Sequence, residues 1–237
     1  MKKSFLLIIF PILSYGQLST RISELYKELS KSERYEGSHI GYEGKESKVY
    51  NTYKEINKLA SDKEIEYIAF NGNAVPKMYA TKTLFEKKSK QFLKAFNYAR
   101  QNNQQLKGIS GCVGYSTFLA DKIYQIVFQE KEIIRKAKEF KIFSDSILNA
   151  KNLPDGYDKS IIEEFKVETK WTNPEIDSLL LKMEELVLND KNSSQSLVEL
   201  VCEYNFYTNQ KKPYYDKLLY FDKKYNSELI KQYLGLL

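Results

Sequence analysis

Apolar side chains recur at the spacing of an α-helix along almost the whole chain, and this pattern limits the possible folds more than any other feature. The first set lies at positions i, i+3, i+4 and i+7 of one helical face and consists of Ile22, Leu25, Tyr26 and Leu29. Alternation of apolar and polar residues, which marks a half-buried strand, forms no run of useful length. The sequence therefore predicts an all-α protein, a stack of antiparallel helix pairs joined by short polar turns.

Individual helices follow from the same spacing and from the turn residues at their ends. We expect helices over residues 49–60, 64–70 and 74–87, the last of them capped by Asn73 and carrying a proline in its first turn. The helical register is strongest after Pro174.

The helical pattern weakens over residues 148–173, where two clusters of turn residues lie. We place a boundary here, between an N-terminal helical repeat region (residues 17–150) and a C-terminal helical region (residues 151–237). A helix pair cannot bury its apolar face alone and must stack on a neighbour, so the two regions are expected to be continuous.

The start of the chain has the features of a secretory signal peptide. Lys2 and Lys3 provide the charged beginning, and an apolar stretch and the small-x-small sequence Ser-Tyr-Gly follow before Gln17. A proline interrupts the apolar stretch, which is far shorter than the roughly 20 residues of a membrane-spanning helix, so we expect no transmembrane segment. This pattern predicts that residues 1–16 are removed and that the protein is exported, to the periplasm or the extracellular space.

Composition adds little about the partner. Loss of Lys2 and Lys3 from 37 basic residues against 31 acidic ones lowers the net charge from +6 to about +4, and the excess is spread along the chain. We therefore expect no nucleic acid as partner. Many of the 19 tyrosines stand beside lysines. This pairing is typical of an amphipathic helix boundary, and a glycan-stacking or membrane-surface face is the alternative.

The two cysteines, Cys112 and Cys202, are both retained after export. An oxidising compartment would allow a disulfide between them, worth on the order of 4 kcal/mol in the chain-entropy model. Two separate thiols are an equal alternative, with Cys112 at the start of a helix and Cys202 buried in the middle of another. A catalytic thiol is not expected, because the only histidine has no identifiable partner.

A set of residues in the first half carries a resemblance to a known family. The set comprises Ile40-Gly41-x-x-Gly44-x-x-Ser47-x-x-Tyr50, Asn73-Ala74-Val75, Tyr79-Ala80, Leu84 and Gly111-Cys112. It resembles a family of exported, largely uncharacterised proteins of Bacteroidota that look like degenerate HEAT repeats, most clearly over residues 38–127. The resemblance implies a HEAT-like α-solenoid and no activity. HEAT repeats commonly carry a Val-Arg pair where this chain has Pro76-Lys77, and lysine lacks the forked donors of an arginine ladder.

The remaining polar features do not form a catalytic or metal-binding pattern. The glycine-rich segment 38–45 matches no phosphate-binding or dinucleotide-binding motif, so we expect a structural turn before a helix at Ser47. His39 lacks the partners of a general base or a metal ligand. Glu163-Glu164 and Glu184-Glu185 are adjacent pairs that point about 100° apart on a helix, so both are expected on solvated faces. No metal and no cofactor is expected.

A segment near the C-terminus is the candidate binding face. It interleaves aromatic and basic residues, of which we single out Lys212, Tyr214, Tyr215, Tyr220 and Lys224. Such a mixture suits an anionic polymer, a glycan chain or a lipid surface. Two aspartates in the segment dilute its charge, and an ordinary amphipathic helix is the alternative.

These features together predict an exported, non-catalytic α-helical repeat protein that serves as a protein-binding scaffold in the cell envelope. Its partner would be another envelope protein. The alternative is an envelope hydrolase or carbohydrate-active protein with a helical fold. That alternative requires two carboxylates from separate helices, about 5–10 Å apart, in one concave pocket.

Overall fold

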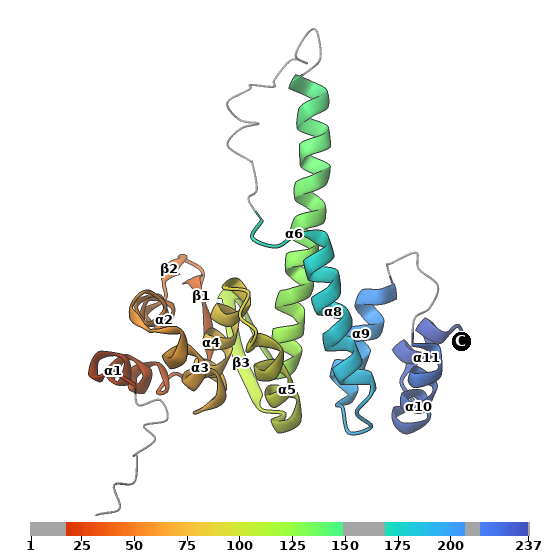
Figure 1. Ribbon diagram of the computed structural model, residues 1–237, viewed down its shortest axis with the longest axis horizontal. Helices are drawn as coiled ribbons and strands as arrows, with labels where there is room; N and C mark the ends of the chain where they lie inside the picture. The colour runs from red at the N-terminus through yellow and green to blue at the C-terminus, as the bar shows by residue number, and fades with distance from the viewer. Residues whose placement is uncertain (1–17, 149–168, 207–213, 237) are drawn as a thin grey trace, which may run out of the picture.

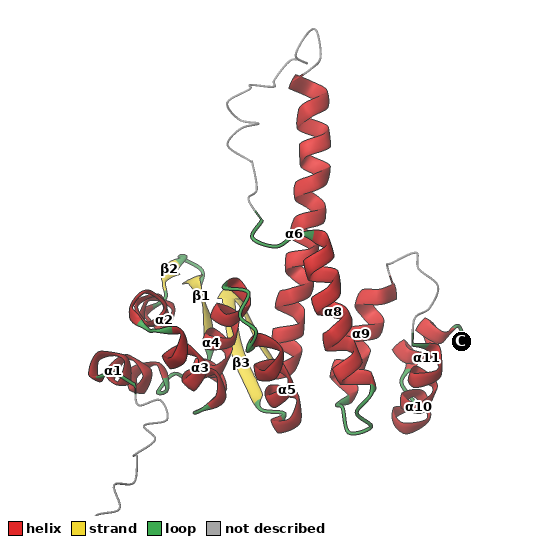
Figure 2. Ribbon diagram, in the orientation of Figure 1, coloured by secondary structure: helices red, strands yellow, loops and turns green. Residues whose placement is uncertain are grey.

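The computed structural model describes residues 18–148, 169–206 and 214–236. Figure 1 and Figure 2 show this part of the chain as a row of α-helices with one small β-sheet among those of the N-terminal half. Its elements are α1 (Thr20–Leu29), β1 (Tyr35–Ile40), β2 (Lys45–Glu46), α2 (Lys48–Leu59), α3 (Asp62–Phe70), α4 (Ala74–Glu86), α5 (Phe92–Asn102), β3 (Gln105–Gly111), β4 (Val113–Phe118), α6 (Leu119–Leu148), α8 (Asn173–Leu188), α9 (Gln195–Phe206), α10 (Tyr215–Tyr225) and α11 (Glu228–Leu234).

The predicted all-α, HEAT-like α-solenoid is wrong, because the described residues include a four-stranded mixed sheet with the strand order β2-β1-β3-β4. β1 pairs with β2, and β3 with β4, as antiparallel neighbours. β1 and β3 run parallel and bring Tyr35 opposite Gly108. The fold is therefore mixed α/β with a predominance of helix.

Glycines make the tight turns of the two strand pairs. The segment 38–45 forms the β1–β2 hairpin, in which Gly41 and Gly44 adopt positive φ angles of 77° and 62°. Gly111, with a φ of 55°, turns the chain from β3 into β4. The sequence predicts Cys112 at the start of a helix, and this prediction is wrong. Cys112 lies in the turn between two strands.

Side-chain caps define the starts of the helices around the sheet. The Ser47 hydroxyl accepts the backbone N–H of Tyr50 at the start of α2, and the Asn73 side chain caps α4 in the same way. These starts confirm the predicted ones. Ser47 also donates a hydrogen bond of 2.6 Å to the buried Glu36 of β1, which fixes the start of α2 against the sheet.

Two helices organise the body. α4 is buried on nearly every side and contacts β1, β3 and α3. The 30-residue helix α6 contacts α4 and α5 and also α8 and α9, and its second half extends beyond the body in Figure 1. One continuous cluster of buried apolar side chains includes residues from α1 to α11. α4 therefore packs on the sheet, and α6 joins this N-terminal part to the C-terminal helices within one shared core.

Several predictions concern residues outside the described part of the chain. These are the signal peptide over residues 1–16, the pair Glu163-Glu164, Lys212, and the boundary placed between residues 150 and 151. Within the described ranges, no helix has both the length and the apolar character needed to cross a membrane.

Candidate functional site

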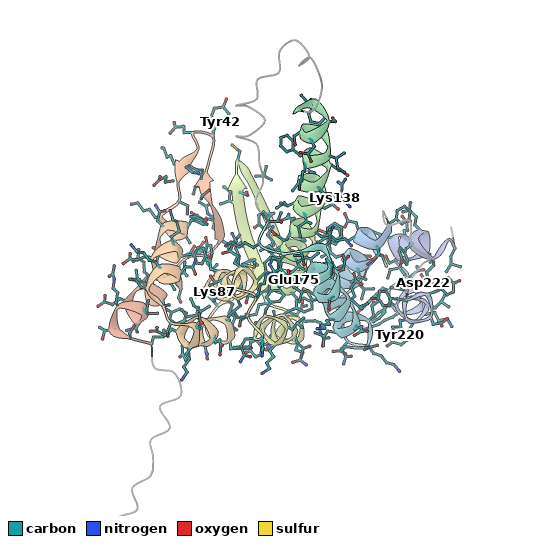
Figure 3. All side chains as sticks on the ribbon, turned by 45° about the horizontal axis from the view of Figure 1, so that its top comes forward. Tyr42, Lys87, Lys138, Glu175, Tyr220 and Asp222 are labelled. Carbon is teal, nitrogen blue, oxygen red and sulfur yellow. The ribbon has the colours of Figure 1, made fainter. Side chains whose placement is uncertain are left out.

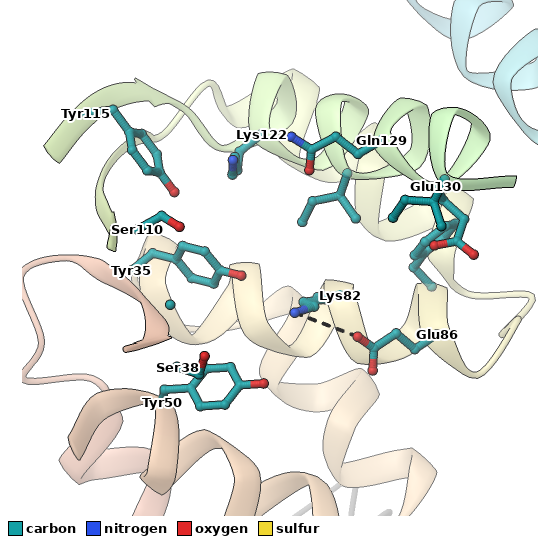
Figure 4. Close-up of a pocket in the computed structure, with 14 residues that line it drawn as sticks. Tyr35, Ser38, Tyr50, Lys82, Glu86, Ser110, Tyr115, Lys122, Gln129 and Glu130 are labelled. Carbon is teal, nitrogen blue, oxygen red and sulfur yellow. Dashed lines mark ion pairs between the residues drawn. The ribbon is translucent and has the colours of Figure 1, made fainter. Parts of the chain in front are cut away.

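A pocket with a volume of about 360 Å³ opens between the sheet and the helices α4 and α6 (Figure 4). We call it the sheet pocket. It is lined by Tyr35, Gly37, Ser38, Tyr50, Lys82, Phe85, Glu86, Ser110, Tyr115, Lys122, Ile126, Gln129, Glu130 and Ile133. Its size lies in the range of small-molecule sites, and its lining mixes apolar, hydroxyl and charged groups, as such sites do.

The two helical walls place like charges at the same end of the sheet pocket. The wall from α6 is a single helical face that comprises Lys122, Ile126, Gln129, Glu130 and Ile133. The wall from α4 comprises Lys82, Phe85 and Glu86. Figure 4 shows both lysines nearer the sheet and both glutamates farther from it. The pocket therefore has a cationic end and an acidic end.

The two lysines differ in how their charge is compensated. Lys82 Nζ lies 3.8 Å from Glu86 Oε1, one helical turn along α4. Lys122 forms no ion pair with any described residue, and its Nζ stands 4.9 Å from the centre of the Tyr115 ring. Burial and, secondly, the charge of Lys82 lower the pKa of Lys122. A ligand anion at this end would relieve both effects.

The acidic end is also incompletely compensated. Glu130 is half-buried and forms no ion pair with a described residue. Burial and, secondly, the charge of Glu86 raise the pKa of Glu130, and Lys170 opposes this rise. The two carboxylates thus come from separate helices and repel each other within one pocket.

Tyrosine hydroxyls surround the cationic end. Tyr35 is only 8% exposed, yet its hydroxyl has no hydrogen-bond partner among the described residues and points into the pocket in Figure 4. The hydroxyls of Tyr50 and Tyr115 lack such partners as well. Burial is the largest cause of the raised pKa values of Tyr35 and Tyr115, so both remain neutral donors at physiological pH. The Tyr35 hydroxyl is open to the pocket and free to donate to a ligand oxygen.

A tyrosine cluster beneath the pocket holds Tyr35 in place. Its ring centre lies 4.5 Å from that of Tyr79, which in turn stacks on Tyr53 at 4.5 Å. The Tyr79 hydroxyl donates a hydrogen bond of 2.6 Å to the carbonyl of Glu36 in β1. Tyr35 is therefore fixed by packing, and its free hydroxyl is a feature of a rigid site.

The structure separates the residues of the predicted C-terminal binding face. The Tyr214 hydroxyl donates a hydrogen bond of 2.9 Å to a buried carboxylate, so this side chain faces the interior. Tyr215 and Tyr220 are 39% and 40% exposed, and Figure 3 shows Tyr220 at the surface. Lys224 donates to a main-chain carbonyl in the α8–α9 loop, and Lys212 lies outside the described residues. Contact of this segment with a glycan or a membrane surface stays a prediction.

The carboxylate that accepts the Tyr214 hydrogen bond belongs to Glu184. The prediction that Glu184 lies on a solvated face is wrong, because the residue is buried. Glu184 is 7% exposed and accepts hydrogen bonds of 2.9 Å from Tyr124, Asn205 and Tyr214. Its helix α8 packs against both α6 and α9, which turns this position inward. Because its lone pairs are used by three donors, Glu184 is a structural group.

Both cysteines are free thiols in this structure. Cys112 is exposed at the β3–β4 turn, whereas Cys202 is buried in α9. Burial and, secondly, Glu199 raise the pKa of Cys202 to about 12, which makes it unreactive. His39 is exposed on β1, and the described part of the chain contains no cluster of histidine, cysteine and acidic side chains that could hold a metal.

Sequence reasoning missed the sheet pocket because its residues come from six elements that only the folded chain brings together. One signal was present. Lys122 and Glu130 lie on the same helical face as Ile126 and Ile133, so each places a charge within an apolar stripe.

Comparison of the chain with protein families, curated proteins and solved structures finds no match. The resemblance to exported proteins of Bacteroidota therefore stays a prediction. Any functional conclusion has to be drawn from the geometry of the sheet pocket.

Proposed function

We propose that this chain is an exported, non-catalytic binding protein of the cell envelope, and that the sheet pocket holds its ligand. One observation carries the proposal: a preformed cavity in which the Tyr35 hydroxyl, Lys122 and Glu130 have no hydrogen-bond or ion-pair partner among the described residues. Partly buried polar groups without partners are costly, and a bound ligand supplies the missing contacts.

The lining groups support binding more than catalysis. One hydroxyl of the sheet pocket, Ser38 Oγ, lies 3.2 Å from a base, His39 Nδ1, but His39 is exposed, and no side chain among the described residues holds its other ring nitrogen as a catalytic pair requires. Export rests on residues 1–16 and belongs to the proposal.

A polypeptide from another envelope protein is the proposed source of the ligand. Near the sheet pocket, the β1–β2 and β3–β4 turns are joined by a hydrogen bond from Gly41 N–H to the Gly111 carbonyl. They carry Tyr42 and Val113, which are 97% and 69% exposed, and Figure 3 shows Tyr42 pointing away from the body. Tyr42 and Val113 thus offer apolar surface to a polypeptide that reaches the sheet pocket from this side.

A hydrolase is the second candidate, because Glu86 and Glu130 converge on one pocket from separate helices.

Thermal unfolding with the low-molecular-mass fraction of the envelope separates these functions. We expect a rise in Tm of about 2–4 °C for each kcal/mol of binding, with the bound solute recovered chemically unchanged in mass spectrometry. Ser110→Trp fills the sheet pocket and should abolish the rise, whereas Ser116→Trp, on the neighbouring strand outside the pocket, should retain it. Conversion of the solute would establish the hydrolase, and the absence of any rise would overturn the binding proposal.

A further inference from the structure

The arrangement of charges in the sheet pocket defines the chemical class of the ligand. Lys82 and Lys122 lie at the end next to the sheet, and Glu86 and Glu130 lie at the other end (Figure 4). The pocket as a whole carries no net charge, so it does not select a simple anion or a simple cation. It selects a molecule with a negative group at one end and a positive group at the other.

The groups at the sheet end suit a carboxylate. The ammonium of Lys122 and the hydroxyls of Tyr35 and Tyr115 are hydrogen-bond donors. None of the three has an acceptor among the described residues. A carboxylate has two oxygens and about four lone-pair sites, which can accept from several such donors at once. Tyr35 as a whole residue is 8% exposed, and its hydroxyl opens onto the pocket, where a ligand oxygen can reach it.

The groups at the far end suit an ammonium. Glu130 forms no ion pair with a described residue. The ion pair of Glu86 among the described residues is the 3.8 Å contact with Lys82. A positive group between the two carboxylates would remove their mutual repulsion. Ile126 and Ile133 alternate with the charged residues along α6 and offer apolar surface between the two ends.

The distance between the two ends sets the length of the ligand. Lys122 and Glu130 are eight residues apart along α6, or about 12 Å of helix axis, whereas the Lys82 and Glu86 side chains of α4 approach each other until Nζ and Oε1 are 3.8 Å apart. The span along α6 is therefore the one that a ligand has to cover. The amine and the carboxylate of a single amino acid share one carbon and cannot span this distance. An extended peptide advances about 3.3–3.6 Å per residue, so two or three residues reach from one end to the other.

We propose that the sheet pocket binds short peptides of two or three residues with both termini free, the C-terminal carboxylate at Lys122 and Tyr35 and the N-terminal ammonium at Glu86 and Glu130. This inference rests on the proposed binding function and adds the ligand class and its orientation. The side chains of the peptide lie along the apolar surface of α6. A peptide released by proteolysis of an envelope protein has this chemistry.

Isothermal titration calorimetry on the full chain tests the proposal with trialanine, N-acetyl-trialanine, trialanine amide and alanine as probes. We expect trialanine to bind, each blocked form to bind at least about tenfold more weakly, and alanine to show no binding, because each cap removes one charge-assisted contact. Equal binding of the free and blocked peptides would overturn the proposal.

Two variants assign the orientation in a way that misfolding cannot imitate. Lys122→Gln should bind trialanine and its amide equally while still discriminating against the acetylated form. Glu130→Gln should bind trialanine and its acetylated form equally while still discriminating against the amide. Lys90→Gln and Glu66→Gln, which change residues outside the sheet pocket, should behave like the unaltered chain. Loss of the same preference in both pocket variants would contradict the proposed orientation.

The outcomes also separate this inference from the proposed function. A Tm rise with envelope solutes but no binding of trialanine overturns the peptide and leaves the binding function standing. Inorganic phosphate that binds as tightly as trialanine, with no effect of Glu130→Gln, shows that the ligand is a plain anion and overturns the peptide proposal. If no solute binds at all, both proposals fall.

Discussion

At the scale of single residues, Gly108 matters because the ring of Tyr115 lies over it. A Cβ at position 108 would lie 2.3 Å from Tyr115 Cζ and 2.5 Å from its hydroxyl. Contacts this short force the ring to move, and the ring belongs both to the lining of the sheet pocket and to the cation–π contact with Lys122. The absence of a side chain at Gly108 is thus what allows Tyr115 to complete the cationic end.

We predict that Gly108→Ala displaces Tyr115 and weakens trialanine binding by about tenfold, with a loss of about 1–2 kcal/mol in the free energy of unfolding from overpacking. Calorimetry and urea unfolding measure the two effects. The matched control is Gly114→Ala on the neighbouring strand β4, outside the sheet pocket, where the nearest atom to a new Cβ is the Gly108 carbonyl oxygen at an ordinary 3.9 Å. Indistinguishable behaviour of the two variants would contradict this role of Gly108.

At the scale of elements, the helices could be predicted from sequence and the strands could not. The predicted ranges 49–60, 64–70 and 74–87 differ from α2, α3 and α4 by at most two residues at either end, because apolar spacing and capping residues agree there. In β3 the buried positions are Leu106 and Gly108, so only one of them is a large apolar residue and the period of two is hidden.

The same reason explains why the candidate site was not foreseen. The parallel pairing of β1 with β3 joins residues that are far apart in the sequence and brings Tyr35 and Ser110 to one pocket with Lys122. Local patterns report the neighbours of a residue along a helix, and carry no information about this pairing. The sequence shows that many tyrosines stand beside lysines, but the arrangement of their side chains around the pocket depends on the sheet.

Glu64 illustrates a contact between elements with a definite pH dependence. Its carboxylate accepts hydrogen bonds of 2.8 Å from the backbone N–H groups of Ser19, before α1, and Ser61, before α3. Burial acts to raise the pKa of Glu64, but the hydrogen bonds from Ser19 and Ser61 outweigh it and lower the pKa to about 2. A carboxyl with a lowered pKa stabilises the folded state above its unfolded pKa and loses this contribution as the pH falls.

We predict that Glu64→Gln lowers the free energy of unfolding at pH 7 by about 1–2 kcal/mol, through loss of charge-assisted capping. The difference from the unaltered chain should shrink as the pH falls from about 4.5 toward 2, where Glu64 itself becomes protonated. Urea unfolding at several pH values measures it. Glu66→Gln, on the same helix, should show neither effect, because the Glu66 side chain forms no hydrogen bond or ion pair with a described residue. A difference that persists unchanged at pH 2 would refute the assignment.

At the scale of the whole molecule, polar and aromatic contacts join the elements before α6 to those after it. Arg100 of α5, whose side chain is 6% exposed, pairs with Asp190 of the α8–α9 loop at 2.5 Å. The only tryptophan, Trp171, stacks on Phe85 of α4 with ring centres 4.9 Å apart. Together with the continuous apolar core, these contacts predict that both halves unfold as one unit.

Asp190→Asn tests this coupling, because it leaves the buried guanidinium of Arg100 without its counter-charge. We predict a loss of about 2–3 kcal/mol in the free energy of unfolding at pH 7, discounted from the value of a fully buried pair because Asp190 is 32% exposed. The hydrogen bond from Arg100 is the largest cause of the lowered pKa of Asp190, so the unaltered chain should lose this contribution as the pH falls below about 4. Asp177→Asn, which breaks the exposed pair with Lys131, should cost less than about 1 kcal/mol.

The spectroscopic readouts decide whether the two halves form one cooperative unit. Trp171 fluorescence reports the junction between the halves, and far-ultraviolet circular dichroism reports the helices of both. In the unaltered chain and in Asp190→Asn the two signals should change at the same urea concentration, with the variant shifted as a whole to lower urea. A fluorescence transition that precedes the loss of helix would show that the halves separate before they unfold. In that case the sheet pocket, whose walls α4 and α6 both pack into the shared core, would owe its rigidity to the N-terminal half alone.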